Sequence, residues 1–144
     1  MTLRSAAGLK AGTRAREPLF VVASAGGTLG AYARLAAALE TDREVLGVRD
    51  PMIWGAREGN EGFRSWVDRY LDAIRQRQPE GPYFICAYSS AGAFGFEIAR
   101  RLRERGEEVA LLALVEPLAL DRGDSRRFGH WALRATWMRP SFRE

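Results

Sequence analysis

The sequence predicts an α/β fold in which a mostly parallel β-sheet carries helices on both faces. Short apolar segments, each long enough for one strand, alternate along the chain with segments whose apolar residues recur at helical spacing. Glycine and proline separate several of these segments. This alternation is typical of parallel strands joined by crossover helices. With 144 residues, the chain is long enough for one domain with a hydrophobic core.

Four apolar runs are predicted to be strands. The first is PLFVVAS at 18–24, and the second is EVLGV at 44–48. The third, YFICAYS at 83–89, runs into a pair of serines, and the fourth is EVALLALVE at 108–116. Each run is short and almost wholly apolar, as expected of strands that are buried on both faces.

Three segments between these runs are predicted to be helices. The first is LGAYARLAAALE at 29–40, and the third, at 90–106, ends on a glycine that suits a helix C-terminus. The second helix, at 63–78, follows a glycine-containing loop at 49–62. Its apolar residues share one face: Trp66, Val67, Tyr70, Leu71 and Ile74.

The chain divides into three parts by composition. Residues 1–17 are small, polar and basic without hydrophobic periodicity, so we expect a linker or flexible arm. Residues 18–120 contain the predicted strands and helices. Residues 121–144 begin as a loop and continue into a short tryptophan-rich helix from Phe128 to Met138.

The charge pattern argues against nucleic-acid binding. The net charge is +4, from 22 basic and 18 acidic residues, and the two signs are interspersed. No basic stripe is interleaved with aromatic residues, as a nucleic-acid interface would require. One cysteine, Cys86, excludes an internal disulfide and a multi-cysteine metal site, and we expect it to be a small buried side chain.

The hydropathy of the chain predicts neither membrane insertion nor export. No apolar run is long enough to span a membrane. Residues 1–17 lack the apolar block of a signal peptide. We therefore expect a cytoplasmic protein.

Ser89 and Ser90 stand where a strand is predicted to turn into a helix. A serine in such a turn can act as a nucleophile, because the turn exposes its oxygen and a helix N-terminus faces the oxyanion. The turn needs small residues two before and two after the nucleophile. These are Ala87 and Ala91 for Ser89, but Tyr88 and Gly92 for Ser90, which favours Ser89. In the alternative interpretation, neither serine reacts and they cap the helix.

The sequence resembles the thioesterase domains of nonribosomal peptide and polyketide synthases and the stand-alone editing thioesterases related to them. The resemblance covers roughly residues 17–120. It is carried by PLFVVASAGGTLGAYARLAAAL near the start and by QPEGPYFICAYSSAGAFGFEIARRLRERGEEVALLAL later in the chain. It implies an α/β-hydrolase fold, with the C-terminal part of the fold and most of the lid absent.

The resemblance also implies a set of catalytic residues. The family's helix pattern of Phe, Glu, Ala and Leu matches the residues after the turn only if Ser89 is the nucleophile. The backbone N–H groups of Ser90 and Ala25 would then form the oxyanion hole, and Glu116 would be the triad acid. The chain departs from the family pattern in two places. It has alanines where the turn usually has glycines, and it lacks a histidine–proline pair before Ala25.

The catalytic histidine of the family has no counterpart among residues 17–120. The only histidine is His130, and by resemblance its position belongs to the lid. A hydrolase of this kind normally needs roughly 200–250 residues. We therefore expect the chain to be the N-terminal part of the fold and to turn over substrate very poorly alone.

The resemblance implies a function as well as a fold. Ser89 would attack an acyl or peptidyl thioester on the phosphopantetheine arm of a carrier protein domain, and water or an internal nucleophile would release an acid or a ring. No metal or redox cofactor is implied. The alternative is a non-catalytic acyl-binding or protein-interaction module, which the two departures and the missing base favour.

Overall fold

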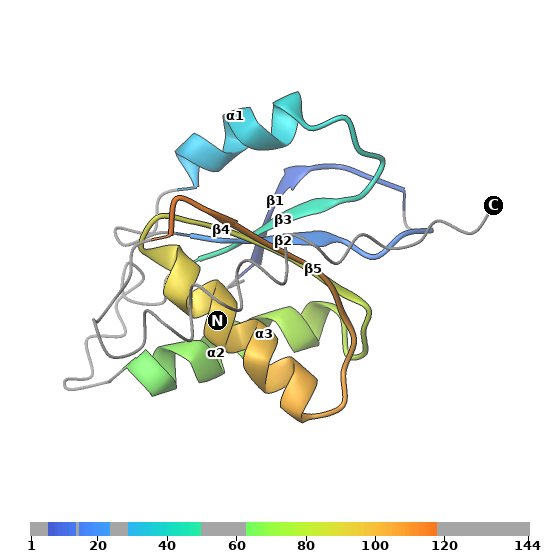
Figure 1. Cartoon of the computed structure of the whole chain (residues 1–144). Helices are drawn as coiled ribbons and strands as arrows, with labels where there is room; N and C mark the ends of the chain where they lie inside the picture. Colours follow the sequence, from blue (N-terminus) through green and yellow to red (C-terminus); the bar gives the residue numbers. More distant parts are fainter. Residues whose placement is uncertain (1–5, 14, 24–28, 50–62, 118–144) are drawn as a thin grey trace, which may run out of the picture.

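The structure is a computed structural model, and it describes residues 6–13, 15–23, 29–49 and 63–117. Five strands form one sheet in the order β1-β3-β2-β4-β5 (Figure 1). The strands are β1 (Ala6–Lys10), β2 (Leu19–Val22), β3 (Val45–Val48), β4 (Tyr83–Tyr88) and β5 (Val109–Val115). β3, β2, β4 and β5 run parallel to one another, and β1 pairs antiparallel with β3.

Three helices cover the two faces of the sheet. Helix α1 (Gly30–Ala38) lies on one face, and α2 (Phe63–Arg77) and α3 (Ala91–Glu104) lie on the other (Figure 1). Alternate residues of the strands therefore enter two separate cores. On the α2 and α3 face, Phe20 and Ile85 pack with Ile74 and Leu102, while Val21 packs with Tyr32 on the α1 face. This mostly parallel α/β arrangement confirms the predicted fold class.

The burial of the strand residues explains why the strands could be predicted from the sequence. Every residue of β3 is buried, and so are Ile85, Cys86 and Ala87 at the centre of β4. Strands that are covered on both faces carry apolar residues at consecutive positions. The prediction that Cys86 is a small buried side chain is confirmed, since it is 7% exposed.

The prediction of a linker or flexible arm over residues 1–17 is wrong for part of that range. Ala6–Lys10 form β1, which pairs Ala6 with Val48 and Gly8 with Leu46. This strand, AAGLK, contains no β-branched or aromatic residue and therefore has little intrinsic strand preference. It forms because the free edge of β3 supplies backbone partners, and the Lys10 side chain donates a hydrogen bond to the Leu39 carbonyl oxygen.

Several predictions fall on residues outside the described ranges. These concern Ala25 with the glycines after it, the loop at 50–62, and the helix from Phe128 to Met138 with His130. They remain expectations from the sequence.

Candidate active site

Ser89 and Glu116 follow the carboxyl ends of two neighbouring strands, β4 and β5. Both residues have left-handed backbone conformations, with φ of 55° at Ser89 and 45° at Glu116. They are the only non-glycine residues with positive φ in the described part of the chain. Such a conformation is strained for a residue with a side chain, and strained residues cluster at functional sites.

Hydrogen bonds hold the Ser89 turn on both sides. The Ser89 N–H donates to the Val115 carbonyl oxygen at 2.9 Å, which ties the turn to β5. The Gly92 N–H donates to the Ser89 carbonyl oxygen at 2.9 Å and starts the first turn of α3. The backbone therefore reverses direction at Ser89 within a few residues, between the end of β4 and the start of α3 at Ala91.

The two serines differ in conformation. Ser90 is the N-cap residue of α3, with φ of −60° and ψ of −24°, and its side chain makes no capping hydrogen bond. Ser89 alone occupies the left-handed position between strand and helix. The alternative of an ordinary side-chain cap is therefore not observed at Ser90.

The residues two before and two after Ser89 are small, as required of a nucleophile turn. Ala87 and Ala91 are completely buried, whereas Tyr88 is 41% exposed. A Cβ atom placed on Gly95 would lie 2.7 Å from the Ala87 Cβ. Helix α3 thus approaches β4 so closely that only one of these two positions can carry a methyl group.

Aromatic side chains gather at the same end of the molecule. The Phe94 ring, near the start of α3, lies 4.8 Å from Phe63, 6.0 Å from Trp66 and 5.6 Å from Tyr70, measured between ring centroids. These four residues are called the aromatic cluster below. The sequence predicts that Trp66 and Tyr70 share a helix face, but it does not predict the cluster. The spacing of Phe63, Trp66 and Tyr70 at i, i+3 and i+7 was the available signal.

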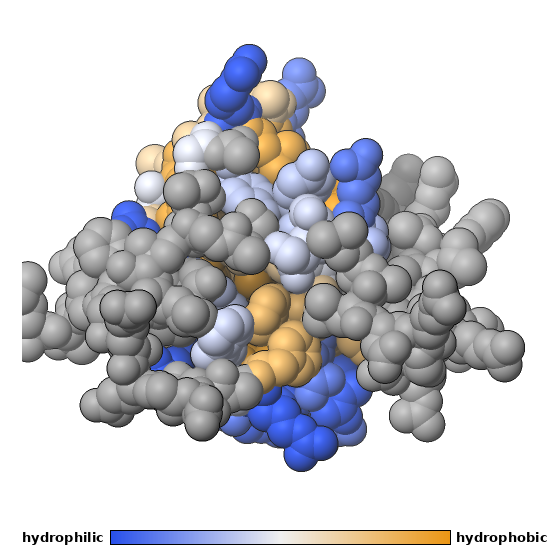
Figure 2. All heavy atoms as spheres, turned by 90° about the vertical axis from the view of Figure 1, so that its left-hand side faces the viewer, coloured by the Kyte–Doolittle hydropathy of each residue, from blue (hydrophilic) through white to orange (hydrophobic). Residues whose placement is uncertain are grey.

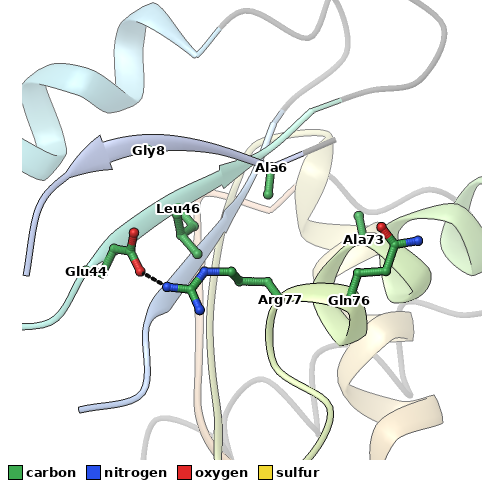
Figure 3. A pocket seen from close by; sticks show the side chains of 7 residues that line it. All are labelled: Ala6, Gly8, Glu44, Leu46, Ala73, Gln76 and Arg77. Carbon is green, nitrogen blue, oxygen red and sulfur yellow. Dashed lines mark hydrogen bonds and ion pairs between the residues drawn. The ribbon is translucent and has the colours of Figure 1, made fainter. Parts of the chain in front are cut away.

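Two hollows in the described part of the chain lie away from Ser89. One, of about 360 Å³, is lined by residues of β1, β3 and α2, and an ion pair between Glu44 and Arg77 crosses it (Figure 3). Neither Ser89 nor Glu116 lines this hollow. The other, about 350 Å³, is lined by charged residues of α2 and α3, among them Arg64 and Arg105. No group of three or more metal-ligating side chains occurs among the described residues.

The family of the chain follows from its match to known proteins. The model of the thioesterase domain family matches residues 17–129. The chain belongs to the thioesterase domain family. The match includes both strands that lead to the candidate site and all three helices.

Relatives of this thioesterase domain occur within large synthases. It is 37% identical over 100 residues to the non-reducing polyketide synthase atnG of an Arthrinium species. The aligned segment covers 69% of this chain and 5% of the synthase. Among solved structures, a four-domain nonribosomal peptide synthetase bound to AMP and glycine matches 80% of this chain and 9% of its own, with 26% identity and a TM-score of 0.73. The chain thus spans a small fraction of these relatives.

A second solved structure contains an isolated thioesterase domain. It is the NocB thioesterase domain in covalent complex with a fluorophosphonate nocardicin G analogue, with 26% identity and a TM-score of 0.65. It matches 81% of this chain and 54% of its own. The thioesterase domain described here therefore shares the α/β-hydrolase fold of these neighbours. No helix in its described segments is long and apolar enough to cross a membrane.

Proposed function

We propose that this thioesterase domain releases an acyl or peptidyl chain from the phosphopantetheine thioester of a carrier protein through a serine acyl-enzyme. The Ser89 Oγ forms a bond to the thioester carbonyl carbon while a general base takes the hydroxyl proton. The C–S bond then breaks and the thiol leaves with a proton. Water, or a nucleophile within the acyl chain, attacks the resulting ester and releases an acid or a ring.

The left-handed conformation of Ser89 is the observation that carries this proposal. A positive φ between a strand and a helix turns the side chain away from the sheet, where a substrate can reach it. The backbone accepts this strain only because hydrogen bonds to Val115 and Gly92 hold both sides of the turn. The covalent fluorophosphonate complex of NocB gives further support, because such reagents react with activated serines.

Ser90 and Glu116 are assigned by their place next to Ser89 in the chain and at the end of the neighbouring strand, and Ala25 is assigned by the family resemblance alone. Ser90 is the N-cap residue of α3, so its N–H lies at the positive end of the helix dipole and suits an oxyanion donor. Ala25 is proposed as the second donor. Glu116, exposed at the end of the neighbouring strand, is proposed as the acid that orients the catalytic base. The proposed partner is an acyl or peptidyl carrier domain, which the multidomain relatives support.

Site-specific labelling tests the nucleophile. A length-completed protein, which includes the histidine-bearing C-terminal part of the family's fold, is treated with a small alkyl fluorophosphonate, and the modified peptide is identified by mass spectrometry. We expect label on Ser89, complete loss of label in Ser89→Ala, and retained label in Ser90→Ala. Label on Ser90, or label that survives Ser89→Ala, would contradict the assignment. Absence of label in the parent would instead favour a non-catalytic acyl-binding module.

A further inference from the structure

An apolar strip of the sheet is open on the face that α1 occupies. Five large hydrophobic side chains are exposed among the described residues, and three of them belong to β4 and β5: Tyr88, Leu111 and Val115. Cys86 and Ala113 pack in the core beneath α1. Side chains alternate along a strand, so the three exposed residues, each two positions from Cys86 or Ala113, face the same side. They are called the open strip below.

Helix α1 leaves this strip uncovered because it packs over other strands. Its buried residues Tyr32 and Ala36 pack with residues of β2, β3 and β4, whereas β5 forms the edge of the sheet. Among the described residues, α1 is the only helix on its face (Figure 1). Parallel strands are normally covered on both faces, so a further element is expected over the open strip.

The charges around β5 indicate what kind of element fits. Glu108 precedes the strand and Glu116 follows it, and both are exposed. The strand between them, VALLALV, carries no charge. An element that is apolar in its middle and basic at its ends therefore complements this part of the sheet.

The tryptophan-rich segment 128–138 has this pattern. It lies outside the described residues, and the sequence predicts a helix there. Four apolar residues recur at helical spacing on one side of that helix: Phe128, Trp131, Ala135 and Met138. Basic residues stand at both ends of the segment: Arg126, Arg127 and Arg139.

The segment can reach the open strip within one chain. A helix over 128–138 is about 16 Å long, and the seven residues of β5 extend about 23 Å. Residues 118–127 can span up to roughly 35 Å, which is enough to turn back along β5. A short tether also gives the segment an effective concentration in the millimolar range. It therefore outcompetes a second copy of the chain in dilute solution.

A second apolar patch is open at the same end of the molecule but suits the segment less. Figure 2 looks onto the side where β4 and β5 end, and it shows apolar surface lower down, at the level of α2 and α3. Phe63, the first residue of α2, is 37% exposed. The next residue, Arg64, lines the hollow between α2 and α3 together with three further arginines and two glutamates. This excess of positive charge disfavours a segment with arginines at both ends.

We propose that segment 128–138 packs the side that carries Phe128 and Trp131 on the open strip. The arginines at its ends then lie near Glu108 and Glu116. Because Tyr88 and Val115 directly precede Ser89 and Glu116, one end of the segment lies beside the candidate active site. The inference does not depend on Ser89 being a nucleophile.

Hydrogen exchange measured by mass spectrometry tests the proposal in the full chain. We expect the amides of 128–138 to exchange about tenfold more slowly than in a synthetic peptide of residues 121–144. Leu111→Gln should raise their exchange rate in the chain about tenfold, because it removes one leucine from the contact. Leu35→Gln is the matched control, since Leu35 lies on α1 and is 38% exposed, against 41% for Leu111. It should leave the exchange rate unchanged.

Two tryptophans of the segment provide a test that leaves the strands intact. Trp131→Ala should speed exchange of 128–138 about tenfold. Trp137 lies half a turn away from Phe128 on the predicted helix, so Trp137→Ala should have little effect. The amides of β4 and β5 should exchange as in the parent in both variants, which shows that the sheet remains folded.

Several results would overturn the proposal. These are exchange of 128–138 at the rate of the free peptide, equal effects of Leu111→Gln and Leu35→Gln, or equal effects of the two tryptophan variants. Faster exchange in Phe63→Gln but not in Leu111→Gln would place the segment on the α2 and α3 side. Protection that disappears on dilution would show that a second copy of the chain covers the strip.

Discussion

The backbone N–H of Ser89 donates a 2.9 Å hydrogen bond to the carbonyl oxygen of Val115, the residue that precedes Glu116. This bond continues the pairing of β4 with β5 beyond the last paired residues, Tyr88 and Val115. The two residues with positive φ are thereby held at the ends of adjacent strands. The sheet thus determines where the proposed nucleophile and the proposed acid lie relative to each other.

The close approach of α3 to β4 predicts that the effect of a methyl group at position 95 changes sign with the residue at position 87. Gly95→Ala should destabilise the domain by about 1–3 kcal/mol, because the new Cβ would lie 2.7 Å from the Ala87 Cβ and neither atom can rotate away. In the Ala87→Gly background the clash is absent. There, Gly95→Ala should stabilise the domain by up to about 1 kcal/mol through helix propensity.

Urea unfolding of the parent, both single variants and the double variant measures this coupling. The remaining neighbours of the added Cβ, Leu114 and Ile85, are at 3.6 and 3.9 Å and need not move. Additive free energies across the four proteins would show that α3 shifts freely away from β4. Ala87, one of the two alanines that replace glycines of the family pattern, would then not be coupled energetically to Gly95.

The strained backbone at Ser89 predicts how substitutions at this position change stability and labelling. Ser89→Gly should be more stable than Ser89→Ala by about 0.5–1 kcal/mol, because glycine tolerates φ of 55° and alanine does not. Both variants should lose fluorophosphonate labelling. Ser65, inside α2, is the control: there glycine should be less stable than alanine by about the same amount. The same ranking at both positions would argue against a strained Ser89.

The ion pairs of Glu97 predict a loss of stability in acid. Glu97 accepts hydrogen bonds of 2.7 Å from Arg100 and 2.9 Å from Arg101, and its side chain is 18% exposed. The hydrogen bond from Arg100 holds the pKa of Glu97 below its ordinary value of 4.5. A lowered folded-state pKa stabilises the fold above the unfolded-state pKa, and this contribution is lost as the pH falls below about 4.5.

Replacement of Glu97 isolates this effect. Glu97→Gln should reduce the free energy of unfolding by about 1–2 kcal/mol at pH 7, and the difference from the parent should shrink below pH 4. Glu104 also pairs with Arg100, but its side chain is 60% exposed. Glu104→Gln should therefore cost less than about 0.5 kcal/mol. A Glu97→Gln deficit that persists undiminished at pH 3 would contradict this account.

Gln78 is predicted to stabilise the turn between α2 and β4. Its side-chain nitrogen donates to the carbonyl oxygens of Glu80 at 2.8 Å and Pro82 at 3.0 Å, and the Tyr83 hydroxyl donates to its backbone carbonyl at 3.0 Å. Gln78→Ala should cost about 1–3 kcal/mol, because it leaves two carbonyl oxygens without a donor. Gln76→Ala, on the exposed side of α2, should be close to neutral in thermal melts. Equal losses of stability in Gln78→Ala and Gln76→Ala would show that the side-chain hydrogen bonds of Gln78 do not stabilise the turn.

Local signals determined most of the fold from the sequence. The strands at 83–89 and 108–116 and the helix at 90–106 were predictable because consecutive apolar residues mark a strand covered on both faces. Their flanking glycines and prolines mark the turns. The same signals placed Ser89 between a strand and a helix. The preference for Ser89 over Ser90 rested on the size of Ala87 and Tyr88, and the structure buries the former and exposes the latter.

Contacts between distant segments decided the rest. β1 was missed because Ala6–Lys10 have little strand preference, and only the free edge of β3 makes them a strand. The aromatic cluster was missed because Phe63 and Phe94 belong to different helices, and their rings meet only when both helices pack on one face of the sheet. The left-handed conformations of Ser89 and Glu116 likewise have no signal in residue type. Side-chain size and apolar spacing act along the chain, whereas edge pairing and ring packing depend on which segments the folded sheet brings together.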